Sequence, residues 1–125
     1  MNLSGAWTGF IDDDARSFPF SLTLTDTDGV LTGMTEELNV WGRGTGELVY
    51  GQVHGHRDGP TVNFRKVYEL EGEEDRPVIH IGFISEDGWR IEGRWIVAGD
   101  RSGRFMLDRV ATAGMQEAAA LWVCA

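Results

Sequence analysis

Turn signals recur so regularly along this chain that they leave room for little besides short strands. Glycine tolerates positive φ and aspartate bonds its own backbone, so a cluster such as Asp26-Thr27-Asp28-Gly29 favours a tight turn. Seven such clusters occur, at residues 12–14, 26–29, 42–46, 58–60, 71–75, 86–88 and 99–103. They separate eight segments, at 5–11, 18–25, 30–36, 47–56, 61–69, 78–85, 89–97 and 103–109. Even spacing without long helical patterns is typical of an antiparallel β-barrel or β-sandwich.

Several segments alternate between apolar and polar residues, as a strand with one buried face does. The residues that share a face are Phe18, Phe20, Leu22 and Leu24 in the second segment, Val62, Phe64, Lys66 and Tyr68 in the fifth, and Trp89, Ile91, Gly93, Trp95 and Val97 in the seventh. The segment 78–85 is apolar on both faces. Either of its faces, or both, could therefore be buried.

The composition is that of a single globular domain. Of the 125 residues, 42% are hydrophobic and 25% are charged, and no stretch approaches the roughly 20 apolar residues of a membrane helix. The first residues lack the features of a signal peptide, so we expect a cytoplasmic protein with no membrane contact. The net charge of −9 repels phosphate backbones, which argues against a nucleic-acid partner. Cys124 is the single cysteine and permits no internal disulfide.

We expect one β-barrel domain over residues 1–110, followed by a C-terminal segment over residues 111–125. That segment consists mostly of helix formers, so it could be a short helix or an irregular tail. Its apolar anchors would be Leu121, Trp122 and Val123.

The sixth segment carries an apolar stripe that could lie on the outside of the barrel. If His80 and Gly82 face the interior, then Ile79, Ile81 and Phe83 lie outside. An exposed stripe of this size is typical of a subunit interface, which would make the protein a homo-oligomer. The alternative is that the C-terminal segment covers the stripe.

Two short motifs resemble the calycin superfamily, which includes lipocalins, fatty-acid-binding proteins and avidins. Gly5-Ala6-Trp7 is similar to the superfamily's Gly-x-Trp opening, and residues 28–36 are similar to the avidin hairpin from the second strand into the third. Gly93-x-Trp95 also fits such a barrel. The resemblance implies an all-β, antiparallel up-and-down barrel of about eight strands, often oligomeric, with an avidin-like or lipocalin-like ligand pocket at one mouth.

The same comparison argues against biotin as the ligand. Gly9 stands where avidins place an asparagine, and Thr35 and Glu37 stand where a tyrosine and a serine follow. A glutamate would bring negative charge to the ureido oxygen of biotin, and a buried unpaired charge is costly.

Lys66 is the most unusual residue on a predicted inner face, because it lies between Phe64 and Tyr68. A buried ammonium needs a partner. It could anchor an anionic or carbonyl-bearing ligand. It could instead form an ion pair with Glu36 or Glu37, or extend to the barrel mouth.

Metal binding and catalysis have weaker signals. His54 and His56 share a strand face and could form a zinc site with His80, but polar histidines at a strand end are more common. No nucleophile elbow or phosphate-binding glycine loop is present. We therefore expect no metal, no cofactor and no catalytic residue, and keep an enzyme acting through Glu36, Glu37, Lys66 or His80 as an alternative.

The function that we predict is the binding of a small, partly apolar molecule, with an anionic group as one option, inside the barrel. The pocket is predicted to be lined by Trp7, Phe20, Tyr50, Phe64, Lys66, Tyr68, His80 and Trp95. The alternative is a structural or interaction protein, whose filled barrel oligomerises or docks a protein partner through an outer strand face.

Overall fold

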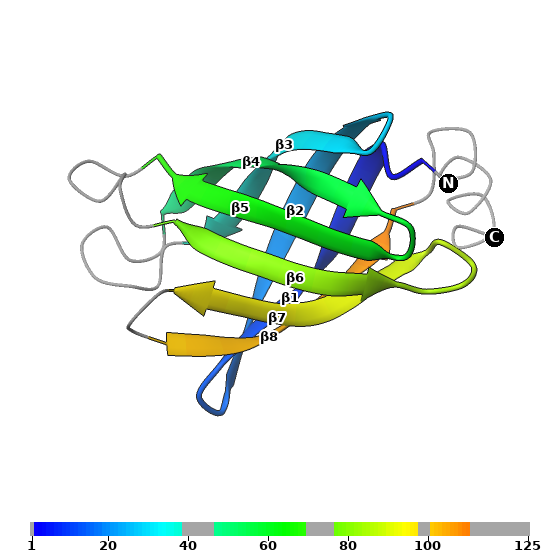
Figure 1. Cartoon of the computed structure of the whole chain (residues 1–125). Helices are drawn as coiled ribbons and strands as arrows, with labels where there is room; N and C mark the ends of the chain where they lie inside the picture. The colour runs from blue at the N-terminus through cyan, green and yellow to red at the C-terminus, as the bar shows by residue number, and fades with distance from the viewer. Residues whose placement is uncertain (1, 39–46, 70–76, 98–100, 111–125) are drawn as a thin grey trace, which may run out of the picture.

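The chain folds into a closed barrel of eight antiparallel strands (Figure 1). The computed structural model describes residues 2–38, 47–69, 77–97 and 101–110. The strands are β1 (Gly5–Asp13), β2 (Arg16–Thr27), β3 (Val30–Leu38), β4 (Leu48–Asp58), β5 (Thr61–Tyr68), β6 (Val78–Ile84), β7 (Arg90–Val97) and β8 (Arg101–Arg109). Each strand pairs with its neighbours in the chain, and β1 pairs with β8 to close the barrel. The predicted all-β antiparallel barrel of eight strands is confirmed.

The described residues include no helix, and therefore none with the length and apolar character needed to cross a membrane. The predicted C-terminal segment, residues 111–125, lies outside the described ranges. The barrel is compatible with a calycin-like fold in general.

Pairing across β6 decides which face of the ambiguous segment points inward. His80 lies directly opposite Phe64 on β5 and Trp95 on β7, and directly paired residues point to the same side of a sheet. Phe64 and Trp95 are buried, so His80 is inside with them. Ile81 and Phe83 consequently lie on the outer face, where they are 45% and 65% exposed.

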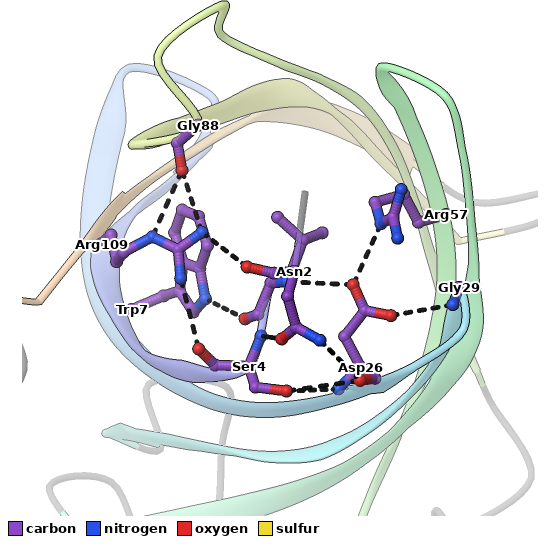
Figure 2. Close-up of polar contacts among 9 residues, drawn as sticks. Asn2, Ser4, Trp7, Asp26, Gly29, Arg57, Gly88 and Arg109 are labelled. Carbon is purple, nitrogen blue, oxygen red and sulfur yellow. Dashed lines mark hydrogen bonds and ion pairs between the residues drawn. The ribbon is translucent and has the colours of Figure 1, made fainter.

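One end of the barrel is closed by the N-terminal residues, and we call it the Trp7 end (Figure 2). The carboxylate of Asp26 accepts hydrogen bonds from the backbone N–H groups of Leu3 and Gly29 and from Nε of Arg57, at 2.9, 2.9 and 3.0 Å. The indole N–H of Trp7 donates to the carbonyl of Leu3 at 3.0 Å. These bonds hold residues 2–4 across the barrel end.

Arg109 completes the closure of the Trp7 end. Its guanidinium lies 4.5 Å from the centre of the Trp7 ring and donates to the backbone carbonyls of Asn2, Ser4 and Gly88 (Figure 2). A guanidinium over an indole face contributes a cation–π attraction as well as packing. The Trp7 end is therefore a structural plug made of residues 2–4 and the side chains that hold them.

Candidate functional site

The opposite end, where β3 and β5 finish, holds a buried ion pair, and we call it the Glu37 end. Nζ of Lys66 on β5 lies 2.7 Å from Oε2 of Glu37 on β3. The Lys66 side chain is 0% exposed and that of Glu37 is 7% exposed. The phenol of Tyr68 donates to Oε1 of Glu37 at 3.0 Å. Of the alternatives for Lys66, the structure shows the ion pair, and it selects Glu37 over Glu36, which points outward.

A glycine on the intervening strand makes this contact possible. β4 runs between β3 and β5, and Gly51 pairs with Thr35 on one side and Tyr68 on the other. A Cβ atom on Gly51 would lie 2.5 Å from Oγ1 of Thr35 and 2.8 Å from Cγ of Lys66. The absence of a side chain at residue 51 therefore leaves the space in which Lys66 crosses towards Glu37.

Aromatic rings surround the ammonium of Lys66. Nζ lies 4.6 Å from the ring centre of Tyr68 and 5.5 Å from that of Phe20. Burial lowers the pKa of Lys66, and the charge and hydrogen bond of Glu37 oppose that change. Burial and the negative charge of Glu37 raise the pKa of Tyr68, so its phenol keeps the proton that it donates.

His80 extends this polar group into the aromatic core. Its ring stacks on Phe64 at a centroid distance of 4.7 Å and meets Phe105 edge-on at 4.9 Å. Neither ring nitrogen has a hydrogen-bond partner among the described residues, and Oγ1 of Thr35 has none either. Buried polar atoms are nearly always paired in native proteins, so two such side chains near one ion pair require an explanation.

The pKa of His80 lies well below its ordinary value of 6.5. The principal cause is burial, and the positive charge of Lys66 adds to it. A contact with the backbone of Val78 opposes the shift. His80 is therefore neutral in the folded protein at neutral pH.

This neutral histidine predicts a pH-dependent stability. Below pH 6.5 the unfolded chain binds a proton at His80 and the folded protein does not, so stability falls as the pH falls. We expect the free energy of unfolding to drop by about 1.4 kcal/mol per pH unit from this residue between about pH 6 and pH 5. Urea denaturation at several pH values measures the slope. His80→Phe, which keeps a ring on Phe64, should lack this contribution, and an unchanged slope in the variant would contradict the assignment.

Most of the residues predicted to line a pocket do face the interior. Phe20, Phe64, Lys66, Tyr68, His80 and Trp95 contribute to it from four strands. Trp7 is also buried, but it belongs to the plug at the Trp7 end. The indole N–H of Trp95 donates to the carbonyl of Asp12 at 2.8 Å, which fixes that ring against the barrel wall.

Tyr50 does not belong to the interior, which corrects the predicted pocket. It is 39% exposed on the outer face of β4, whereas Val49 and Gly51 point inward. Apolar residues occupy both faces at the start of β4, so local alternation does not fix its orientation. The pocket predicted from the sequence did not include Thr35, Gly51 or Glu37, although Glu37 was considered as an ion-pair partner of Lys66 and as an acid–base residue. Thr35 and Glu37 lie an even number of residues after Leu31, so they share its strand face. This alternation is the sequence signal that places them inside the barrel.

The three histidines do not meet. His54 and His56 lie on the outer face of β4 with their ring centres 5.9 Å apart, whereas His80 is inside the barrel. Within the described ranges, no group of three or more potential metal ligands is close enough to hold an ion.

No protein-family model matches this chain, and no curated protein matches it.

Proposed function

We propose that the protein binds a small, partly apolar molecule inside the Glu37 end of its barrel, against the Lys66–Glu37 pair. The observation that carries the proposal is the cluster of buried polar groups among aromatic rings. Glu37, Lys66 and Tyr68 are joined to one another, while Thr35 and His80 have unpartnered polar atoms. An eight-stranded barrel is wide enough to be filled by side chains or to hold one small ligand.

Energetics support a functional role for this cluster. A buried ion pair is often no more stable than apolar side chains of similar volume, and an unpartnered buried polar atom costs stability. A barrel selected only for stability would gain by replacing these residues with apolar ones. A ligand that bonds to Thr35 or His80 accounts for the residues, because it would supply the missing partners.

The same contacts suggest the chemistry of the ligand. Glu37 already neutralises Lys66, so a carboxylate ligand would have to compete with it. A neutral hydroxyl or carbonyl group fits better, since a neutral imidazole and a hydroxyl can each donate and accept. The rings of Phe20 and Tyr68 suit an apolar or aromatic body. Tyr68 is half-buried and Glu37 keeps slight exposure, so we expect the ligand to enter from this end.

Native mass spectrometry of gently purified protein is the first test. We expect one additional small-molecule mass per barrel, or, for protein purified without ligand, a rise in melting temperature with an aryl alcohol such as cinnamyl alcohol. Bare protein that is not stabilised by a panel of aryl and alkyl alcohols, aldehydes and carboxylates would contradict the proposal.

Thr35→Val separates binding from stability. Valine matches the shape of threonine and removes the unpartnered hydroxyl, so the free energy of unfolding should stay the same or rise by about 1 kcal/mol. Affinity for cinnamyl alcohol should fall about tenfold if that hydroxyl bonds to it. Calorimetric titration and urea denaturation measure the two quantities. Thr23→Val on the outer face of β2 is the matched control and should leave the affinity unchanged. A loss of stability in Thr35→Val would show that the hydroxyl has a partner.

The outer face of β6 favours a second candidate function, association with another copy of the chain. Phe83 lies opposite Glu92, and Ile81 lies opposite Arg94. This arrangement places a carboxylate at one end of the apolar stripe and a guanidinium further along it. A two-fold contact would set unlike charges against each other around a shared apolar centre. The same native spectrum reads the oligomeric state, and a bare multimer would favour this candidate.

A further inference from the structure

Lys66 is the only lysine in the sequence, and its amine stands in an unusual setting. It is fully buried, is paired with one carboxylate at 2.7 Å and is flanked by a phenol that bonds to the same carboxylate. A desolvated lysine amine is a nucleophile that condenses with carbonyl compounds. The cluster thus contains an amine, an acid–base partner for it and an aromatic enclosure.

We propose that Lys66 captures a small aryl or conjugated aldehyde as a covalent imine, with Glu37 as the counterion of the product. This inference rests on the proposed function, because the aldehyde has to enter the Glu37 end of the barrel. It assigns that site a class of ligand and a covalent mode of binding.

The reaction needs no component beyond the aldehyde. The ammonium of Lys66 passes one proton to Glu37, and the lone pair of Nζ then attacks the carbonyl carbon. A second proton moves from nitrogen to the carbonyl oxygen, which gives a carbinolamine. Glu37 returns its proton to the hydroxyl, water leaves, and the C=N bond forms with one proton still on nitrogen. The products are an iminium, the Glu37 carboxylate and one water molecule.

Conservation of charge favours this product in a buried site. An ammonium–carboxylate pair becomes an iminium–carboxylate pair, so no unpaired charge is created in the interior. Nζ starts 2.7 Å from the carboxylate that serves as proton acceptor and donor. The rings of Phe20 and Tyr68, at 5.5 and 4.6 Å from Nζ, would face the cationic C=N bond as they now face the ammonium.

Three further features support the reaction. Burial lowers the pKa of Lys66, which makes the neutral amine more accessible than in an exposed lysine. Exclusion of water from the site slows hydrolysis of the imine once it has formed. The unpartnered nitrogens of His80 and the hydroxyl of Thr35 are available to bond to the departing water or to a polar substituent.

The test is reductive trapping on the folded full-length chain. The protein is incubated separately with benzaldehyde, cinnamaldehyde and hexanal, then treated with sodium cyanoborohydride and analysed by peptide mass mapping. We expect the aryl aldehydes to add their mass, less one oxygen atom, to Lys66 in preference to the N-terminal amine. Denaturation in urea should abolish the preference. Absence of a Lys66 adduct with all three aldehydes would overturn the proposal.

Two variants test the roles of the individual groups. Lys66→Arg keeps a cation for Glu37 but cannot form an imine, so the adduct should be lost. Glu37→Gln removes the counterion. The cinnamaldehyde imine should then lose the red-shifted absorption of an iminium at neutral pH, while borohydride still traps it. An unchanged spectrum in Glu37→Gln would exclude the counterion role.

Cinnamyl alcohol separates failure of this inference from failure of the proposed function, because it has the same skeleton and cannot form an imine. Binding of the alcohol without trapping of the aldehyde would overturn covalent capture and leave the binding function intact. Absence of both would overturn both.

Discussion

Glu37→Ala is expected to remove about 3–5 kcal/mol from the free energy of unfolding, since it leaves the charge of Lys66 buried without a partner. The Lys66 side chain is fully enclosed, so its ammonium depends on the Glu37 carboxylate for charge compensation. The phenol of Tyr68 loses its acceptor in the same variant. Urea denaturation monitored by tryptophan fluorescence measures the change.

Two controls establish that the loss comes from the broken pair. Glu36→Ala changes the neighbouring carboxylate, which lies outside the barrel, and should alter stability by less than about 0.5 kcal/mol. The double variant Lys66→Met with Glu37→Leu removes both charges and should recover most of the loss. If Glu37→Ala cost no more than Glu36→Ala, the pair would not be isolated from solvent as the structure shows.

Gly93→Ala is expected to cost more than about 4 kcal/mol or to prevent folding, because the added Cβ has no space and its neighbours are backbone atoms. That atom would lie 1.9 Å from the carbonyl oxygen of Ile81 and 2.5 Å from Cα of Gly82. Gly82 and Gly93 pair directly, so two strands approach closely where neither has a side chain. The clash of the added Cβ could be relieved only if β6 and β7 moved apart. Circular dichroism and urea denaturation report the outcome.

Gly59→Ala is the matched control for Gly93→Ala. Gly59 adopts a φ of +58°, and a Cβ on it would meet no atom within 4 Å. Only the backbone penalty of the left-handed region applies there, which costs about 1–2 kcal/mol. A Gly93→Ala protein as stable as Gly59→Ala would show that β6 and β7 are spaced more widely than the structure indicates.

The asymmetry of the barrel ends connects the fold to the proposed function. At the Trp7 end, the polar groups of Asp26 and Arg109 are bonded to the backbone of residues 2–4 and to adjacent turns. At the Glu37 end, Thr35 and His80 retain polar atoms that have no partner in the part of the chain that the structure describes. Polar residues thus stabilise closure at one end, whereas at the other they leave atoms to which the proposed ligand would bond.

Local chemistry was sufficient to predict the strands. Turn clusters and a side-chain period of two are properties of a few consecutive residues, so the boundaries of the eight strands fall within two residues of the predicted ones. The same parity placed Phe64, Lys66 and Tyr68 on one inner face, and the structure shows them there. What the sequence determined by itself was therefore the strand count, the fold class and the buried lysine.

The partners of these residues were decided only by the tertiary structure. Glu36 and Glu37 are adjacent in sequence and point to opposite faces, so the choice of ion-pair partner depends on the register of β3 against β4. Apolar residues on both faces of β6 left its inward face undetermined. The same feature at the start of β4 led to the wrong orientation for Tyr50. Barrel closure removes such ambiguities, because the inward-facing residues of every strand must lie beside the inward-facing residues of both neighbouring strands. Lys66 and Glu37 are 29 residues apart and meet over a glycine on a third strand. Such a contact depends on three strands at once, which no local pattern encodes.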